Sequence, residues 1–283
     1  MKKIQLLALC ATVAGVLSSC QKEEITEEIV TETVPENLSN EHQTALIDAA
    51  VNPLNAEYTT LKSIDGSSIK GIKSGDIFLR LDKLSEYSLK SASGSEKQYR
   101  TTNLVNQNST INVVGYTGSG YALTSVMQTG LQYAINNYNN ENISLTFNLT
   151  FSSSTSGADI VIFNGGGTDA GAVAEFPSGG NPGFWIEVYG GMNSYNDQIN
   201  EHLMTHEIGH AIGFRHTDYA NRKCDGSNEG FTEYGALFIP GTPSVNQWGA
   251  SGLDTDSIMI SCFSGNEDGE FSYYDSVALE YLY

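Results

Sequence analysis

Hydrophobic residues recur at helical spacing in several parts of the chain. Between Tyr121 and Tyr138 the apolar positions are three and four residues apart, which places them on one face of a helix. A second helix is predicted from Tyr195 to Phe214, and a shorter one from Glu41 to Val51. Near the C-terminus, the sequence Ser272-x-x-Asp275 predicts a capping box that opens a last helix with an apolar face.

Shorter apolar runs between these helices predict β-strands. Residues Asp159 to Phe163 form a continuous apolar run after the aspartate, as in a buried strand, and end at the turn Asn164–Gly167. Residues Leu145 to Leu149 alternate between apolar and polar positions. The remaining strand candidates are Asp76–Leu81, Ile111–Val114, Ala170–Phe176 and Phe184–Tyr189. From position 101 onward the chain therefore alternates between strands and helices.

The first residues are predicted to be a targeting segment. Two lysines precede an apolar run from Ile4 to Leu17, which is too short for a convincing membrane span. The run ends in Leu17-Ser-Ser-Cys20, which resembles a lipobox, so residues 1–19 would be removed and Cys20 lipidated. The alternative is an ordinary signal peptide with a chance cysteine. The acidic segment that follows, up to residue 40, predicts a disordered tether.

The residues after Cys20 also bear on location. Gln21-Lys-Glu-Glu24 resembles the export tag that sends some Gram-negative lipoproteins to the outer face of the outer membrane. We therefore expect an exported lipoprotein that is exposed at the cell surface and touches the membrane through its lipid anchor only. We also expect a monomer.

Charge divides the rest of the chain into two segments. Positions 101–283 carry 19 acidic and three basic residues, whereas positions 42–100 carry seven acidic and eight basic residues. This difference predicts a separate N-terminal region, 41–100, that docks on an acidic domain, 101–283. The formal net charge of −19 argues against nucleic-acid binding, which requires clustered lysine and arginine.

One short segment carries most of the candidate chemistry. It reads His206-Glu-Ile-Gly-His210-Ala-Ile-Gly213-Phe-Arg-His216. Residues four apart lie on one face of a helix, so His206 and His210 can bind one zinc ion, with Glu207 beside them as general base for a water that the metal activates. Gly213 can end the helix with a backbone angle that other residues resist, and the chain can then turn so that His216 supplies a third nitrogen.

These eleven residues match the motif of the metzincin metallopeptidases. The stretch His206–His210 with Thr217-Asp218, and Lys97–Thr101 before the domain, resemble the dual-action HEIGH metallopeptidases in particular. The resemblance implies an α+β, zincin-like catalytic domain with a mixed, twisted sheet, an active-site helix and a C-terminal helix. It also implies an edge strand near Ala170–Phe176 on which a substrate docks in extended form.

The resemblance adds further candidate residues. Met259 would form the turn that lies beneath the metal in metzincins. Ser261 stands where some relatives place a tyrosine near the metal, so Tyr273 or Tyr274 could serve instead. Asp218 could accept a hydrogen bond from a metal-binding imidazole or fix the loop.

Two further sites are less determined. Asp159, Asp169 and the nearby turn could bind Ca²⁺. Cys224 and Cys262 would form one disulfide in an oxidising compartment, with two buried thiols as the alternative.

The predicted function is zinc-dependent hydrolysis of peptide bonds in a protein or peptide substrate. One alternative is a catalytically silent surface binding lipoprotein on the same fold, although a binding protein would not need Glu207. Another is a zinc amidase or glycan-processing hydrolase. Region 41–100 is predicted to be a pro-segment or a regulatory region; it has no cysteine that could block the metal, and Asp76 is its candidate for that role.

Overall fold

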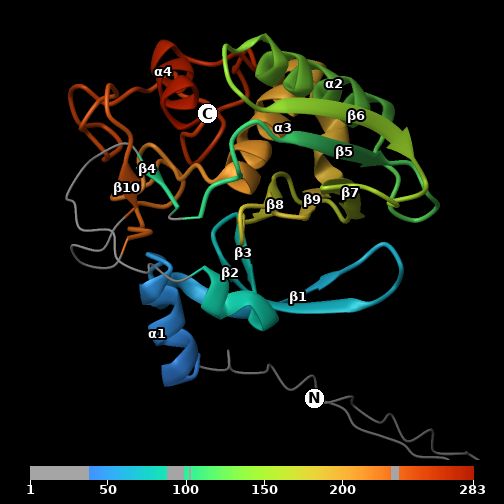
Figure 1. The fold of residues 1–283 in the computed structure, drawn as a ribbon, viewed down its shortest axis with the longest axis horizontal. Coiled ribbons are helices and arrows are strands. Elements are labelled where there is room, and N and C mark those ends of the chain that lie inside the picture. The colour runs from blue at the N-terminus through green and yellow to red at the C-terminus, as the bar shows by residue number, and fades with distance from the viewer. Residues whose placement is uncertain (1–37, 88–98, 102, 231–235) are drawn as a thin grey trace, which may run out of the picture. The chain divides into compact units, whose positions relative to one another are not determined.

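The computed structural model describes residues 38–87, 99–101, 103–230 and 236–283. An eight-stranded sheet runs through these residues in the order β1-β2-β3-β8-β9-β7-β5-β6 (Figure 1). In chain order the strands are β1 Ala56–Lys62, β2 Ser68–Ser74, β3 Ile77–Arg80, β5 Thr110–Tyr116, β6 Thr146–Ser152, β7 Ile160–Gly166, β8 Ala172–Glu175 and β9 Trp185–Tyr189. Strands β4 (Tyr99–Arg100) and β10 (Leu237–Phe238) form a separate two-stranded pair.

The direction of the strands confirms the prediction of a mixed sheet. Strands β6, β5, β7 and β9 are parallel neighbours, whereas β8 runs antiparallel to β9. The predicted strands all form, with ends that shift by at most three residues. The predicted signal segment and the tether up to residue 37 lie outside the described residues.

Two long helices, α2 (Ser125–Asn140) and α3 (Asp197–Ile212), lie side by side along the sheet (Figure 1). They approach closely at Gly130, where a Cβ atom would lie 2.6 Å from the backbone of Asn200. Further along, the Tyr138 hydroxyl donates a hydrogen bond of 2.8 Å to the carbonyl of Thr205. Helix α3 is buried on all sides from Ile199 onward, so it forms the centre of the core.

The C-terminal helix α4 (Tyr273–Leu282) begins at the predicted capping box. Ser272 accepts from the Asp275 backbone amide, and the Asp275 carboxylate accepts from that of Ser272. The same carboxylate accepts hydrogen bonds from Ser257 Oγ and from the Ile258 amide. One buried side chain thus joins the last helix to the segment that contains Met259.

The N-terminal region adds α1 (Asn40–Asp48), short 3₁₀ turns at Pro53–Asn55 and Leu81–Glu86, and the hairpin β1–β2. The hairpin was missed at the sequence level because most β1 positions are polar and partly exposed, so β1 shows no apolar run. A small apolar core lies between these elements, formed by side chains such as Leu46, Ile72 and Leu79. The described residues include no helix that is long and apolar enough to cross a membrane.

Strand β3 connects this region to the main sheet. It pairs in parallel with β8, with Ile77 opposite Ala174 and Phe78 opposite Glu175. The Ala174 amide also donates to the carbonyl of Asp76 at 2.9 Å. The free edge of β8, where a substrate was expected to dock, is therefore covered by residues of the chain's own N-terminal region.

Candidate metal centre

Helix α3 supplies two imidazoles from successive turns and then stops abruptly. His206 and His210 are both buried near its C-terminal end. The helix ends at Gly213, whose φ of 121° lies in the region that favours glycine. The amides of Gly213 and Phe214 both donate back to the carbonyl of Gly209, at 3.0 and 2.8 Å. The backbone can therefore leave the helix axis and bring the next residues back toward the two histidines.

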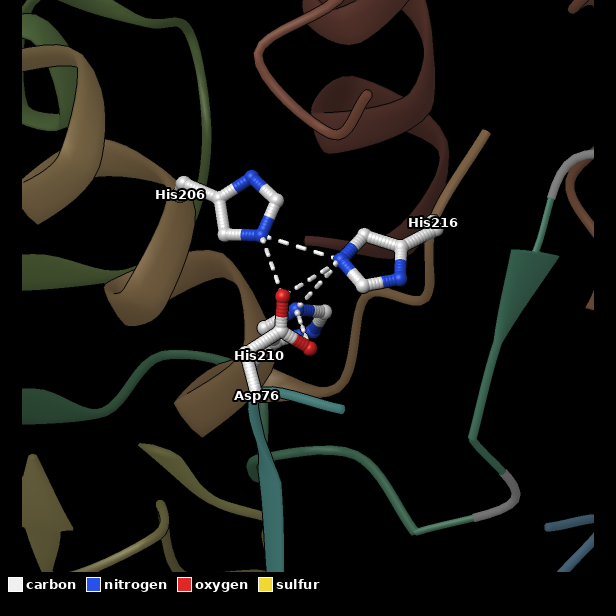
Figure 2. A group of neighbouring side chains, drawn as sticks. All are labelled: Asp76, His206, His210 and His216. Atoms are coloured by element: carbon white, nitrogen blue, oxygen red, sulfur yellow. Dashed lines mark hydrogen bonds and ion pairs between the residues drawn. The ribbon is translucent and has the colours of Figure 1, made fainter. Parts of the chain in front are cut away.

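Two backbone hydrogen bonds then hold the chain on either side of His216. The Arg215 amide donates to the carbonyl of Tyr99, and the Thr217 amide donates to that of Met259, at 2.8 and 2.7 Å. As a result, the Nε2 atom of His216 lies 3.1 Å from that of His206 and 3.2 Å from that of His210 (Figure 2). Two nitrogens on one tetrahedral zinc ion lie about 3.3 Å apart, so this spacing fits the metal.

The hydrogen bonds of the three Nδ1 atoms show why a cation fits the site. His206 Nδ1 faces the carbonyl of Ile258 at 2.7 Å, and His210 Nδ1 faces that of Phe214 at 2.8 Å. His216 Nδ1 is hydrogen-bonded to the carboxylate of Glu229. Because these oxygens only accept, each Nδ1 carries the proton and each Nε2 presents a lone pair to the others. Three converging lone pairs repel one another unless a cation lies between them.

Glu207 lies next to this group. Its side chain is 1% exposed, and its Oε2 atom has no hydrogen-bond partner among the described residues. Burial, and then the negative charge of Asp76, raise the pKa of Glu207 well above its usual range. An unpaired carboxylate with a raised pKa beside a metal site is suited to accept and return a proton.

Asp76 closes the fourth side of the group. It precedes β3, and its two carboxylate oxygens lie 3.1 Å from His216 Nε2, 3.6 Å from His210 Nε2 and 3.7 Å from His206 Nε2 (Figure 2). Its Oδ1 atom is buried and accepts no hydrogen bond from the described residues. Among the described residues, this is the one group of three or more histidine, cysteine, aspartate or glutamate side chains whose ligand atoms lie close enough together to hold a metal ion.

A buried charge cluster supports His216 from behind. The Glu229 carboxylate, which holds His216 Nδ1, also lies 3.2 Å from Arg222 Nη1 and 3.6 Å from Arg215 Nη2. All three of these charged residues are buried. Burial opposes ionisation, but the interaction with the His216 imidazole and the charges of Arg222 and Arg215 lower the pKa of Glu229. Glu229 therefore faces the imidazole as a carboxylate.

The structure places Met259 beneath α3, where its sulfur would lie 2.6 Å from a Cβ atom added to Gly209. Asp218 takes the second of the two roles considered for it. Its carboxylate accepts from the Lys223 amide, the Ser261 amide and the Ser261 hydroxyl, at 2.6, 3.0 and 2.9 Å. Asp218 thus fixes the loop after His216 to the loop after Met259, and among the described residues its partners include no imidazole.

A disulfide joins the same two loops. Cys224 is bonded to Cys262, with Cα atoms 5.3 Å apart, which confirms the predicted disulfide. Both cysteines line a cavity of ≈ 300 Å³ that also reaches His206, Glu207 and Asp76. The cavity walls come from the N-terminal region, the segment before β8, helix α3 and the loop after Met259.

Other predicted residues stay apart from this centre. Asp159 accepts from the amide and the side chain of Asn112, and neither it nor Asp169 belongs to a metal-binding group among the described residues, so the Ca²⁺ prediction has no support. Tyr273 and Tyr274 lie at the start of α4, 75% and 37% exposed. Cys20 lies outside the described residues.

Sequence reasoning missed Glu229 completely. It is 13 positions beyond His216 in an irregular segment, so no periodic spacing connects the two residues. One signal was available in the composition. Positions 101–283 contain only three basic residues, and two of them, Arg215 and Arg222, turn out to be buried beside Glu229. Buried arginines need an acidic partner, so their presence close to His216 pointed to a carboxylate nearby.

Together the mixed sheet, the central helix with two histidines, the glycine that ends it and the returning third histidine define a metallopeptidase of the zincin type. The chain belongs to the dual-action HEIGH metallopeptidase family, whose family model matches residues 72–283. The matched range begins within β2 and so includes Asp76 as well as the histidines.

Two solved structures of myroilysin are also similar. The first shares 20% sequence identity and a TM-score of 0.38, and the match covers 62% of this chain and 80% of that one. The second shares 19% identity and a TM-score of 0.35, and covers 65% of this chain and 90% of that one. No curated protein matches the chain.

Proposed function

We propose that this metallopeptidase is a zinc-dependent endopeptidase in which His206, His210 and His216 hold the metal and Glu207 is the general base. The observation that carries the proposal is the convergence of three Nε2 atoms, with that of His216 3.1 and 3.2 Å from the other two, beside a buried carboxylate oxygen without a partner among the described residues. A silent binding protein would have no use for the second feature.

The chain's own groups account for the proton transfers of peptide hydrolysis. A zinc ion bound here would polarise the scissile carbonyl and lower the pKa of a water molecule to about 7. Glu207 accepts the proton of the attacking water and delivers it to the leaving amine. The Nδ1 hydrogen bonds keep the three rings oriented throughout, and no covalent bond to the protein forms.

The substrate would bind as an extended chain along β8. This short strand lies beside α3, and its outer edge already pairs with another strand, β3, in the way an extended peptide would pair, which supports the proposal. Because main-chain hydrogen bonds need no free substrate terminus, this arrangement favours cleavage within a chain.

Glu207→Ala tests the catalytic assignment. Zinc content and chelator-sensitive cleavage of a mixed peptide library are measured for the wild type and the variant, before and after limited trypsinolysis. We expect both proteins to bind one zinc ion and only the wild type to cleave. Turnover by Glu207→Ala would refute the role of the base, and zinc binding without cleavage by the wild type in any form would favour the binding-protein alternative.

We further propose that residues 41–100 are a pro-segment that keeps the enzyme latent. Two contacts support this: the Asp76 carboxylate occupies the fourth side of the histidine group, and β3 occupies the edge of β8. A salt bridge of 3.0 Å from Lys83 to the buried Glu175 fastens the segment further along. Metal access and substrate binding are thus blocked by adjacent residues of one segment.

Asp76→Ala tests the latch in the full chain, with Asp82→Ala as the matched control because Asp82 is an exposed carboxylate of the same segment. We expect Asp76→Ala to cleave a small peptide weakly before any proteolysis, because β3 still covers the edge of β8, while Asp82→Ala stays silent until trypsin is added. The region 101–214 contains no lysine or arginine, so trypsin should leave a resistant fragment. Full activity of the uncut wild type would rule out the latch.

We propose, finally, that the protein is exported as a lipoprotein anchored through Cys20, with Zn²⁺ as its one catalytic ion and without nucleic-acid partners. The lipobox-like sequence before Cys20 supports the anchor. Mass spectrometry of the mature N-terminus should find a lipid-modified Cys20. An unmodified N-terminal residue would exclude the anchor without touching the catalytic proposal.

A further inference from the structure

The third histidine differs from the other two in the way it is held. His206 and His210 belong to α3, and their Nδ1 atoms donate to backbone carbonyls that the surrounding fold fixes. His216 lies in an irregular segment beyond the helix, and its Nδ1 partner is a side chain that returns from position 229. The loop between His216 and Glu229 is closed by a hydrogen bond of 2.9 Å from the Glu229 amide to the carbonyl of Tyr219.

The orientation of Glu229 favours the imidazole over its arginine neighbours. Its Oε1 atom makes the contact with His216 and lies 3.2 Å from Arg222. Its Oε2 atom, 3.6 Å from Arg215 Nη2, has no hydrogen-bond partner among the described residues, and neither does that guanidinium nitrogen. A carboxylate placed only to neutralise two arginines would be expected to make a bidentate contact with one of them.

A buried carboxylate costs free energy of folding, so its presence here indicates a role that an apolar side chain could not fulfil. Glu229 is 3% exposed, and a buried carboxylate is stabilised only by charged partners and hydrogen bonds. The two arginines supply charge compensation, while Oε1 accepts the hydrogen bond from the ring. An anionic acceptor also raises the electron density at the opposite ring nitrogen, the atom that faces the metal site.

We propose that Glu229 is a positioning residue of the metal centre, which holds His216 with its Nε2 atom toward the metal and strengthens that nitrogen as a ligand. The guanidinium groups of Arg215 and Arg222 lie 3.6 and 3.2 Å from the Glu229 carboxylate and hold it in place. The inference rests on the proposed zinc site, but it assigns a role that the metzincin motif itself does not contain.

The test compares zinc affinity in the full chain, by competition with a chromophoric chelator, for the wild type, Glu229→Gln and Glu229→Ala. Loss of such a partner typically weakens metal binding about 10- to 100-fold. We expect that range for Glu229→Ala and a smaller loss for Glu229→Gln, which keeps the shape and an acceptor oxygen but not the charge. Glu201→Gln is the control, because Glu201 is a buried carboxylate of α3 that bonds to Asn137.

A second measurement separates positioning from a structural role. The visible spectrum of the cobalt-substituted chain reports the geometry around the metal, and it should shift in both Glu229 variants but not in Glu201→Gln. Lower thermal stability with unchanged zinc affinity and an unchanged cobalt spectrum would overturn the inference, and would leave Glu229 as an ion-pair partner only. Absence of zinc from the wild type would instead overturn the proposed function, and this inference with it.

Discussion

Replacement of Gly213 by alanine tests how the end of α3 builds the metal site. The φ of 121° is unfavourable for any residue with a Cβ atom, which costs about 1–3 kcal/mol. The new Cβ would also lie 2.7 Å from Leu104 Cδ2 and 3.1 Å from the carbonyl of Asn103. Crowding of this kind costs about a further 1–3 kcal/mol, so the free energy of unfolding should fall by about 2–6 kcal/mol in total.

Gly265→Ala is the matched control for that experiment. Gly265 has a φ of 90°, but a Cβ atom there would meet nothing within 4 Å. It should therefore show the backbone cost alone. Urea denaturation of both metal-free variants gives the two values, and the same proteins are then titrated with zinc. We expect weaker zinc binding only in Gly213→Ala, because Gly213 lies between His210 and His216. If the two variants were equally destabilised, the reasoning about close packing at Gly213 would be refuted.

Three further predictions concern the surroundings of the site. Replacing both Cys224 and Cys262 by serine removes a cross-link between residues 38 positions apart. The free energy of unfolding should fall by about 4 kcal/mol and Tm by about 10 °C. Calorimetry with and without reductant checks this, and a reduced wild type that melts like the oxidised protein would contradict it. Gly209→Ala should destabilise by about 1–2 kcal/mol despite the helix propensity of alanine, because the new Cβ meets the Met259 sulfur at 2.6 Å; additive effects in a double-mutant cycle with Met259→Ala would exclude that contact. Burial, and then His206, lower the pKa of His202 to about 4, so the unfolded chain takes up its proton first as the pH falls below 6.5. The free energy of unfolding of the metal-free protein should then fall by up to about 3 kcal/mol between pH 6.5 and 4. His202→Gln should show a shallower pH dependence of this free energy.

The local parts of the molecule were predictable because their causes are local. The two histidines at i and i+4, the glycine that ends α3 and the Ser272–Asp275 capping box depend on residues within one or two turns of each other, so spacing alone indicated them. The hairpin β1–β2 gave no comparable signal, because it lies at one end of the sheet and buries few of its side chains.

The residues that spacing could not reveal are those that long-range pairing brings to the centre. Asp76 reaches the histidines because β3 adds to the edge of β8, a contact between segments about a hundred positions apart. Glu229 reaches His216 through an irregular loop that two buried arginines hold in place. Glu229 also connects its own loop to the N-terminal region, since its carbonyl accepts a hydrogen bond of 2.8 Å from the Asn52 amide of that region. The motif therefore specifies the chemistry of the site, whereas tertiary contacts determine how its third histidine is held and where the N-terminal region lies beside it.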